Sequence, residues 1–289
     1  MGQQVSGVAA PAEIHACASC CLDTASVQVA FGHITRLDQP KRSTTCQRCL
    51  SPSVAALPYL LSLNLARNNL DGSLPPTFSK RLTSLDLSGN RLHGPLPASI
   101  ARCTNLTRLH LQQNALTGAL PASIGRLRRL QSLRLEYNSL DGPLPESLFD
   151  LVHLTRLNLR ANCFTGGLSD RIGRLSRLKF LSVRNNLLHG PLPPTLSDCR
   201  ALTFLNVSSN AFSGTIPASL AQLHSLRFVY LFENDFDGTL PASLQSLPQL
   251  KEIDARRNPR LVVVATEAKP CHQLQLPCTP DVIVPLPAS

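Results

Sequence analysis

An asparagine that recurs at a fixed spacing restricts the fold of this 289-residue chain more than any other feature. The intervals between successive asparagines are 22 residues once and 24 residues seven times. Apolar residues precede each one, so the unit has the form L-x-x-L-x-L-x-x-N-x-L. Such a period predicts a solenoid, in which each repeat packs against its neighbours. The asparagines are Asn68, Asn90, Asn114, Asn138, Asn162, Asn186, Asn210, Asn234 and Asn258.

The L-x-L part of each unit alternates with a period of two. This pattern predicts a short strand whose leucines point inward and whose other residues point outward. Strands of successive repeats are expected to stack into one parallel sheet. Each Asn stands where a strand ends, so its amide is expected to pair with backbone groups at the bend. We therefore assign the asparagines a structural role.

A second half-repeat follows each strand, for example L-T-G-A-L-P at residues 116–121. Gly permits a tight turn there, and Pro ends the extended stretch. The next residues, such as 122–127, suit one helical or 3₁₀ turn. The predicted fold class is an α/β repeat, a leucine-rich solenoid with a parallel concave β-sheet and short helical or 3₁₀ turns on its convex side.

Together the two half-repeats resemble the plant-type leucine-rich repeat of 24 residues with an L-x-G-x-[IL]-P segment. Such repeats occur in plant receptor ectodomains, polygalacturonase-inhibiting proteins and trypanosomatid surface-antigen-like proteins. The resemblance extends over residues 60 to about 260. It implies a curved or twisted solenoid that binds proteins, peptides or glycans. The chain departs from the pattern in its first repeat, which is two residues short, and at Ser169, where other full repeats have Pro.

The domain organisation follows from the repeats, because a solenoid must close its core at both ends. Residues 32–38 resemble the strand of a plant-type N-terminal cap, and Cys271 and Cys278 resemble the cysteine pair of a C-terminal cap. Four segments are expected: a flexible N-terminus that could carry a lipid anchor (1–16), a Cys-containing cap (17–59), nine repeats (60–258), and a C-terminal cap with a Pro-rich tail (259–289).

The net charge of +10 comes from 28 Lys and Arg against 18 Asp and Glu, and 23 of the basic residues are Arg. Arg is well suited to bidentate contacts with carboxylate or phosphate, so an acidic partner is expected. The arginines are spread through the repeats, and nucleic acid is therefore not expected as a partner. The longest apolar run, residues 261–265, is too short for a membrane-spanning helix.

The ten cysteines fall into groups with different predicted roles. Cys103 and Cys199 share one position of the repeat and are expected to be buried, whereas Cys163 is expected to be exposed. An N-terminal group with C-x-x-C-C and C-x-x-C spacing could hold Zn²⁺. Disulfides, free thiols and lipid attachment are the alternatives for this group. The candidate metal ligands are Cys17, Cys20, Cys46 and Cys49.

The N-terminal sequence M-G-Q-Q-V-S matches M-G-x-x-x-[ST], in which Gly2 can be myristoylated after Met removal. One acyl chain binds membranes only weakly, so a second signal is required. Cys17, Cys20 and Cys21 are candidates for palmitoylation. This interpretation places the chain in the cytoplasm, at the inner face of a membrane.

An extracellular or cell-surface location is the alternative. Residues 1–30 lack the basic start and apolar segment of a secretory signal peptide, so the signal would have been removed. Two N-x-[ST] sequons, at Asn105 and Asn206, would matter only in an exported chain. Disulfide-bonded caps would also require an oxidising compartment.

The outward strand positions, six, four and two residues before each Asn, form the candidate partner-binding surface. Three Phe follow one another in the first column, beside recurring Arg. Interface hot spots are enriched in Tyr and Arg, and exposed apolar patches often mark binding. Alternatively, the Phe rings mainly stabilise the sheet. The predicted contact residues are Arg108, His110, Arg134, Arg156, Arg160, Phe180, Arg184, Phe204, Phe228, Tyr230 and Phe232.

This surface predicts a protein-interaction scaffold or recognition module. Its expected partner is a protein or peptide with acidic and apolar groups, and a glycan is the second candidate. A structural spacer is a third possibility. The outward columns contain no converging nucleophile, base and orienting group, and the sequence has no phosphate-binding loop or hydrolase motif. Neither an enzyme nor a cofactor is expected.

Overall fold

The computed structural model describes residues 27–30, 33–38, 50 and 52–263. Several sequence predictions fall outside these residues: Gly2, Cys17, Cys20, Cys21, Cys46, Cys49, Cys271 and Cys278. Within the described residues, no group of three or more His, Cys, Asp or Glu could hold a metal ion. None of the helices in this part of the chain has the length and apolar content needed to cross a bilayer.

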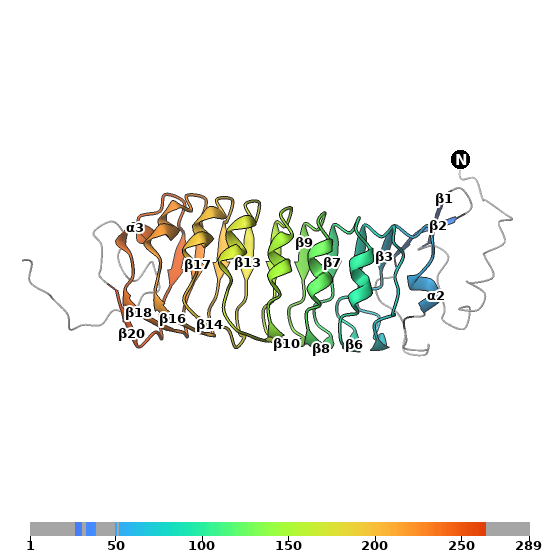
Figure 1. Cartoon of the computed structure of the whole chain (residues 1–289), viewed down its shortest axis with the longest axis horizontal. Coiled ribbons are helices and arrows are strands. Elements are labelled where there is room, and N and C mark those ends of the chain that lie inside the picture. The colour runs from blue at the N-terminus through green and yellow to red at the C-terminus, as the bar shows by residue number, and fades with distance from the viewer. Residues whose placement is uncertain (1–26, 31–32, 39–49, 51, 264–289) are drawn as a thin grey trace, which may run out of the picture.

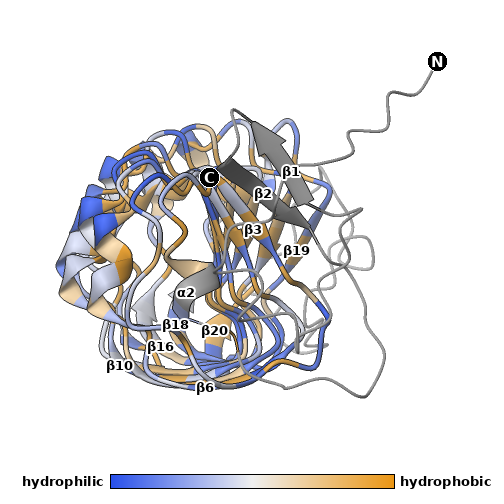
Figure 2. Ribbon diagram, turned by 90° about the vertical axis from the view of Figure 1, so that its right-hand side faces the viewer, coloured by the Kyte–Doolittle hydropathy of each residue, from blue (hydrophilic) through white to orange (hydrophobic). Residues whose placement is uncertain are grey.

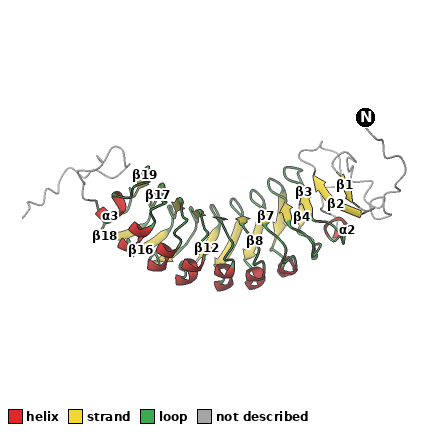
Figure 3. Cartoon of the chain, turned by 90° about the horizontal axis from the view of Figure 1, so that it is seen from above, coloured by secondary structure: helices red, strands yellow, loops and turns green. Residues whose placement is uncertain are grey.

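The described part of the chain is an elongated stack of repeats (Figure 1). Seen from above it is an arc, and its main sheet follows the inner side (Figure 3). The strands of this sheet are β1 (Val27–Ala30), β2 (His33–Asp38), β3 (Ser62–Asn64), β5 (Ser84–Asp86), β7 (Arg108–His110), β9 (Ser132–Arg134), β11 (Arg156–Asn158), β13 (Phe180–Ser182), β15 (Phe204–Asn206), β17 (Phe228–Tyr230) and β19 (Glu252–Asp254). They pair in this order, all parallel except β1 with β2. The predicted parallel concave sheet and the fold class are confirmed.

The second half-repeats also form strands, where the sequence analysis expected an extended stretch and a turn. They are β4 (Asp71–Ser73), β6 (Arg91–Gly94), β8 (Ala115–Ala119), β10 (Ser139–Pro143) and β12 (Cys163–Thr165) in one sheet, and β14 (His189–Gly190), β16 (Ala211–Thr215), β18 (Asp235–Thr239) and β20 (Arg260–Val262) in another. Glycine is needed within them, since Gly118 has φ +74° and Gly142 has φ +70°. Viewed along the solenoid, these strands close the side between the main sheet and the helices (Figure 2).

Short helices lie on the outer side of the arc (Figure 3). They are the 3₁₀ helices η3 (Ala98–Arg102), η4 (Ala122–Arg126), η5 (Glu146–Asp150), η6 (Asp170–Arg174), η7 (Pro194–Asp198) and η8 (Ala218–Gln222), and the α-helices α2 (Pro52–Ala55) and α3 (Ala242–Gln245). Pro precedes most of the 3₁₀ helices. In η6, Ser169 takes this place, and its hydroxyl oxygen accepts a hydrogen bond from the Arg171 amide. The shortened first repeat has turns at 80–81 in place of a helix.

Asparagines join the repeats to one another, as predicted. Asn162 Nδ2 donates to the carbonyl oxygens of Leu135 (3.0 Å) and Leu159 (3.1 Å), while its Oδ1 accepts from the Leu140 amide (3.0 Å). The residue before each repeat Asn has a positive φ, for example Ala161 at +53°. The chain therefore bends sharply after each strand, and the Asn side chain satisfies the backbone groups that the bend leaves without ladder partners.

The repeat cysteines differ in exposure, as predicted. Cys103 and Cys199 are buried, and Cys163 is exposed. Burial raises the pKa of the Cys103 thiol to about 11; burial and the charge of Asp198 raise the pKa of Cys199 to about 12. Because only the thiolate reacts readily, we expect iodoacetamide at pH 8 to label Cys163 roughly a hundredfold faster than Cys103 or Cys199 in the native protein. Peptide mass mapping measures this, and equal rates would contradict the burial.

Candidate functional site

Eight of the eleven predicted contact residues lie on strands of the main sheet, and Arg160, Arg184 and Phe232 lie two residues beyond the ends of β11, β13 and β17. Arg108, Arg156, Phe180, Phe204 and Phe228 begin their strands and lie in register, because Arg156 pairs with Phe180, Phe180 with Phe204, and Phe204 with Phe228. Buried leucines and a valine alternate with them along each strand. The outward columns are therefore continuous across several repeats.

Aromatic rings on this face pack into a continuous row, which we call the aromatic row: Phe180, Phe204, Phe228 and Tyr230. The rings of Phe180 and Phe204 are stacked with centroids 4.4 Å apart and 7° between their planes. Phe228 and Tyr230 tilt against Phe204 at 6.2 and 5.6 Å. Each contact of this kind contributes about 0.5–1.5 kcal/mol. The row thus stabilises the sheet, and its half-buried rings still present apolar surface.

Tyr230 is held in a defined orientation by a hydrogen bond. Its hydroxyl donates to Glu252 Oε2 at 2.9 Å. Burial, together with this hydrogen bond and the nearby charges of Glu252 and Asp254, raises the pKa of Tyr230 to about 12. The phenol therefore stays neutral at physiological pH and offers a fixed polar group at the edge of the aromatic row.

Three of the predicted arginines lie over aromatic rings. The guanidinium carbon of Arg156 is 4.3 Å from the Phe180 ring centroid, and that of Arg184 is 5.0 Å from Phe232. Arg160 lies 5.1 Å from the Tyr137 ring. None of the three forms an ion pair with a carboxylate of the described residues. Their guanidinium groups lie against ring faces, and the charge of Arg184 also helps to lower the pKa of Glu233, which leaves N–H donors for an anionic group.

The other basic residues on this face have protein partners. Arg134 forms an ion pair with Glu136, a residue that is 4% exposed. Arg108 Nε donates to Ser84 Oγ at 3.2 Å. These two side chains are engaged in contacts within the protein. We therefore expect them to contribute less to binding of an acidic partner than the sequence suggested.

His110 is part of a small polar network. Its Nε2 lies 2.9 Å from Ser132 Oγ, and its Nδ1 lies 3.7 Å from Asp86 Oδ2. Burial alone would raise the pKa of Asp86, but hydrogen bonds with His110 and Ser88 and the charge of His110 outweigh it, and the pKa is lowered. Asp86 thus stays ionised and orients His110, which indicates a contact residue fixed in position.

Three buried polar atoms in one outward column have no hydrogen-bond partner among the described residues. They are Gln112 Oε1, Glu136 Oε2 and Arg160 Nε. Their residues stand two positions before Asn in three consecutive repeats. An unsatisfied buried polar group costs roughly 1–3 kcal/mol, so these three atoms lower the stability of this part of the column.

The family follows from sequence profiles described as Leucine rich repeat. One matches residues 80–140 and 104–164, and a second matches residues 59–80, 177–199 and 201–223. Together these matches extend over more than half of the chain. The protein belongs to the leucine-rich-repeat proteins. No curated protein sequence matches it.

Solved structures with the same fold include plant receptors and an ice-binding protein. The plant peptide hormone receptor RGFR1, in complex with RGF2, is 30% identical over 74% of this chain, with a TM-score of 0.72. The Arabidopsis receptor kinase HAESA, in complex with the peptide hormone IDA and the co-receptor SERK1, is 32% identical over 82%, with a TM-score of 0.72. This chain spans only 34% and 40% of those two receptor chains. A plant ice-binding protein is 25% identical, with 84% of this chain and 86% of that chain covered and a TM-score of 0.62.

Proposed function

We propose that this protein is a recognition module that binds a peptide or extended protein segment across its concave sheet. The partner carries an acidic group next to apolar side chains. Its carboxylate contacts Arg156, Arg160 and Arg184, and its apolar side chains pack on the aromatic row. The repeats are of the plant-type subclass, and no catalytic step is involved.

One observation carries this proposal: three arginines lie against aromatic rings on a single continuous surface without carboxylate partners of their own. Arg and aromatic residues are the side chains most enriched in binding hot spots. A purely structural spacer has no need for this arrangement.

We further propose an extracellular or cell-surface location, in preference to the inner membrane face suggested by the M-G-x-x-x-S start. Support comes from similar structures, which include a plant peptide hormone receptor and a plant receptor kinase in complex with a peptide hormone. Acylation of Gly2 remains a prediction. The intact mass of the protein from a eukaryotic host tests it. A mass that shows loss of Met1 and gain of one myristoyl group would argue for the inner face.

Selection from a random peptide-display library tests the proposed function, using the full chain as bait. We expect the selected peptides to be enriched in Asp or Glu, or in a free C-terminal carboxylate, close to Leu, Ile, Val or aromatic residues. The chosen peptides should compete with one another for a single site, because the arginines and the aromatic row form one surface.

A Phe204→Leu variant serves to connect the selected peptides with the aromatic row, since Leu retains apolar volume but loses ring stacking. We expect peptide binding to weaken by about tenfold. Selection of basic peptides, or of peptides whose binding is unchanged in Phe204→Leu, would argue against the proposal.

A further inference from the structure

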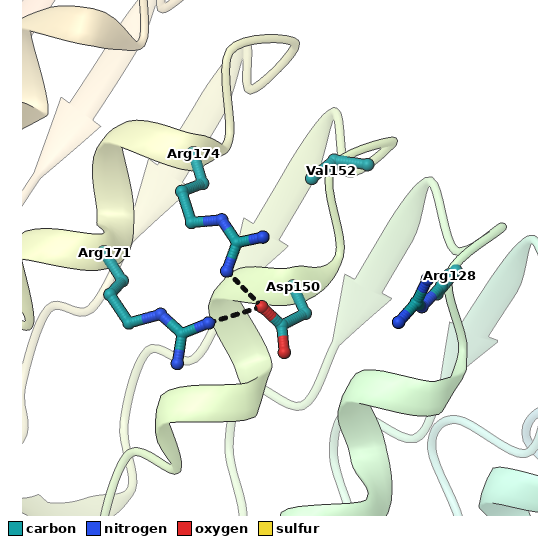
Figure 4. Close-up of a pocket in the computed structure, with 5 residues that line it drawn as sticks. All are labelled: Arg128, Asp150, Val152, Arg171 and Arg174. Carbon is teal, nitrogen blue, oxygen red and sulfur yellow. Dashed lines mark hydrogen bonds and ion pairs between the residues drawn. The ribbon is translucent and has the colours of Figure 1, made fainter.

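The convex side carries a pocket of about 470 Å³ that is remote from the concave sheet. Arg128, Asp150, Val152, Arg171 and Arg174 line it (Figure 4). They come from three consecutive repeats: Arg128 follows η4, Asp150 ends η5, and Arg171 and Arg174 lie on η6. Three guanidinium groups and one carboxylate give the pocket a formal charge of +2.

Arg171 interrupts a regular feature of the solenoid. In other repeats the second residue of the helix is Ser or Thr, and its hydroxyl donates to a backbone carbonyl of the preceding repeat. Such bonds run from Ser99 to Pro76, Ser123 to Ala98, Ser147 to Ala122, Thr195 to Asp170, and Ser219 to Pro194. Only in η6, among the described 3₁₀ helices, does Arg stand at this position. In this repeat the hydroxyl-to-carbonyl bond is replaced by a bond from Arg171 to the side chain of Asp150 in the preceding repeat.

The ion pairs in the pocket hold the arginines without using most of their donors. Arg171 Nη2 and Arg174 Nη1 both donate to the same atom, Asp150 Oδ1, at 2.7 and 2.5 Å. Each guanidinium has five N–H donors, so several on each remain for a ligand. Both side chains are partly exposed, at 41% and 50%. Arg128 lies on the other side of Asp150 from Arg171 and Arg174 (Figure 4) and forms no ion pair with a described residue.

We propose that this pocket, which we call the convex arginine pocket, binds the tetrahedral oxyanion of a phosphate or sulfate group. A dianion matches the formal charge of +2, and its oxygens accept from several guanidinium groups at once, the geometry for which Arg is best suited. Asp150 keeps Arg171 and Arg174 together before the ligand arrives. Val152, 37% exposed, adds an apolar contact for the group that carries the anion.

Titration of the full chain with inorganic phosphate, and separately with inorganic sulfate, at pH 7.5 tests the proposal. Ionic strength is kept constant with chloride, and the Arg Nε–H resonances are followed by NMR. We expect saturable binding with shifts at Arg171 and Arg174. Phosphate binding should weaken at pH 5.5, where phosphate is mostly a monoanion, whereas sulfate binding should not. A preference for one ion at pH 7.5 identifies which kind of ester the pocket takes.

The test variant is Arg171→Ser with Arg174→Gln, in which each replacement is native to another repeat: Ser at this position in η3, and Gln222 at the end of η8. We expect affinity to fall by at least about tenfold. Arg102→Gln is the matched control, because Arg102 ends η3 and lies outside the pocket. Non-saturable shifts, unchanged binding in the double variant, or an equal loss in the control would overturn the proposal.

Discussion

Replacement of Asn162 by Ala is expected to reduce the free energy of unfolding by about 3–5 kcal/mol. The side chain is buried and joins two repeats, since it donates to Leu135 and Leu159 and accepts from Leu140. Ala would leave these backbone groups unsatisfied inside the protein. Urea unfolding followed by circular dichroism measures the effect.

Asn158→Ala is the matched control from the same repeat. Asn158 is only partly buried, and its Oδ1 accepts one hydrogen bond, from the Arg160 amide at 3.3 Å. We expect a loss of about 1 kcal/mol or less for this variant. Similar losses in the two variants would contradict the structural role assigned to the asparagine column.

Charge reversal of Arg160 and Arg184 should weaken binding of a selected acidic peptide by about a hundredfold or more. Each arginine loses charge-assisted hydrogen bonds to the ligand carboxylate, and each new Glu repels it. The change breaks no ion pair with a described carboxylate, although a Glu at position 184 loses the attraction of Arg184 to Glu233. Isothermal titration calorimetry measures the affinities.

Reversal of Arg102 and Arg126 changes the net charge by the same amount on the convex side, where these residues end η3 and η4. This control should lower affinity only slightly, by a factor of about two to three, through the loss of long-range attraction. If the two double variants lower the affinity for the peptide equally, binding depends on overall charge and the assignment of the site to the concave face is wrong.

Most of the fold was predictable because one periodicity determines several features at once. The spacing of Leu and Asn places the repeat strands of the main sheet, their inward apolar residues and the bends after them. These strands are β3, β5, β7, β9, β11, β13, β15, β17 and β19. The second sheets were not predicted, because a segment such as 115–119 contains Gly and lacks a long apolar alternation. This segment becomes a strand because it pairs with the equivalent segments of the adjacent repeats, and the sequence of one repeat does not reveal that pairing.

The positions of the site residues were predictable, but the contacts between their side chains were not. The outward columns located the aromatic row and the arginines, since strand alternation fixes the side of each residue. Which charges neutralise one another depends on side-chain conformation, and thus the ion pair of Arg134 with Glu136 and the ring contact of Arg160 with Tyr137 were missed. The convex arginine pocket was missed as well. Its sequence signal is Arg171, which stands at a helix position where the other repeats have Ser or Thr.

A photo-cross-linking measurement tests the central claim, that the partner lies on the concave sheet. Benzoylphenylalanine replaces Asn158, between Arg156 and Arg160, or Arg102 on the convex side as the control. We expect a selected acidic peptide to cross-link to the protein through position 158 and not through position 102, and free competitor peptide to abolish the product. Cross-linking at position 102 alone, or at neither position despite saturating peptide, would contradict the account.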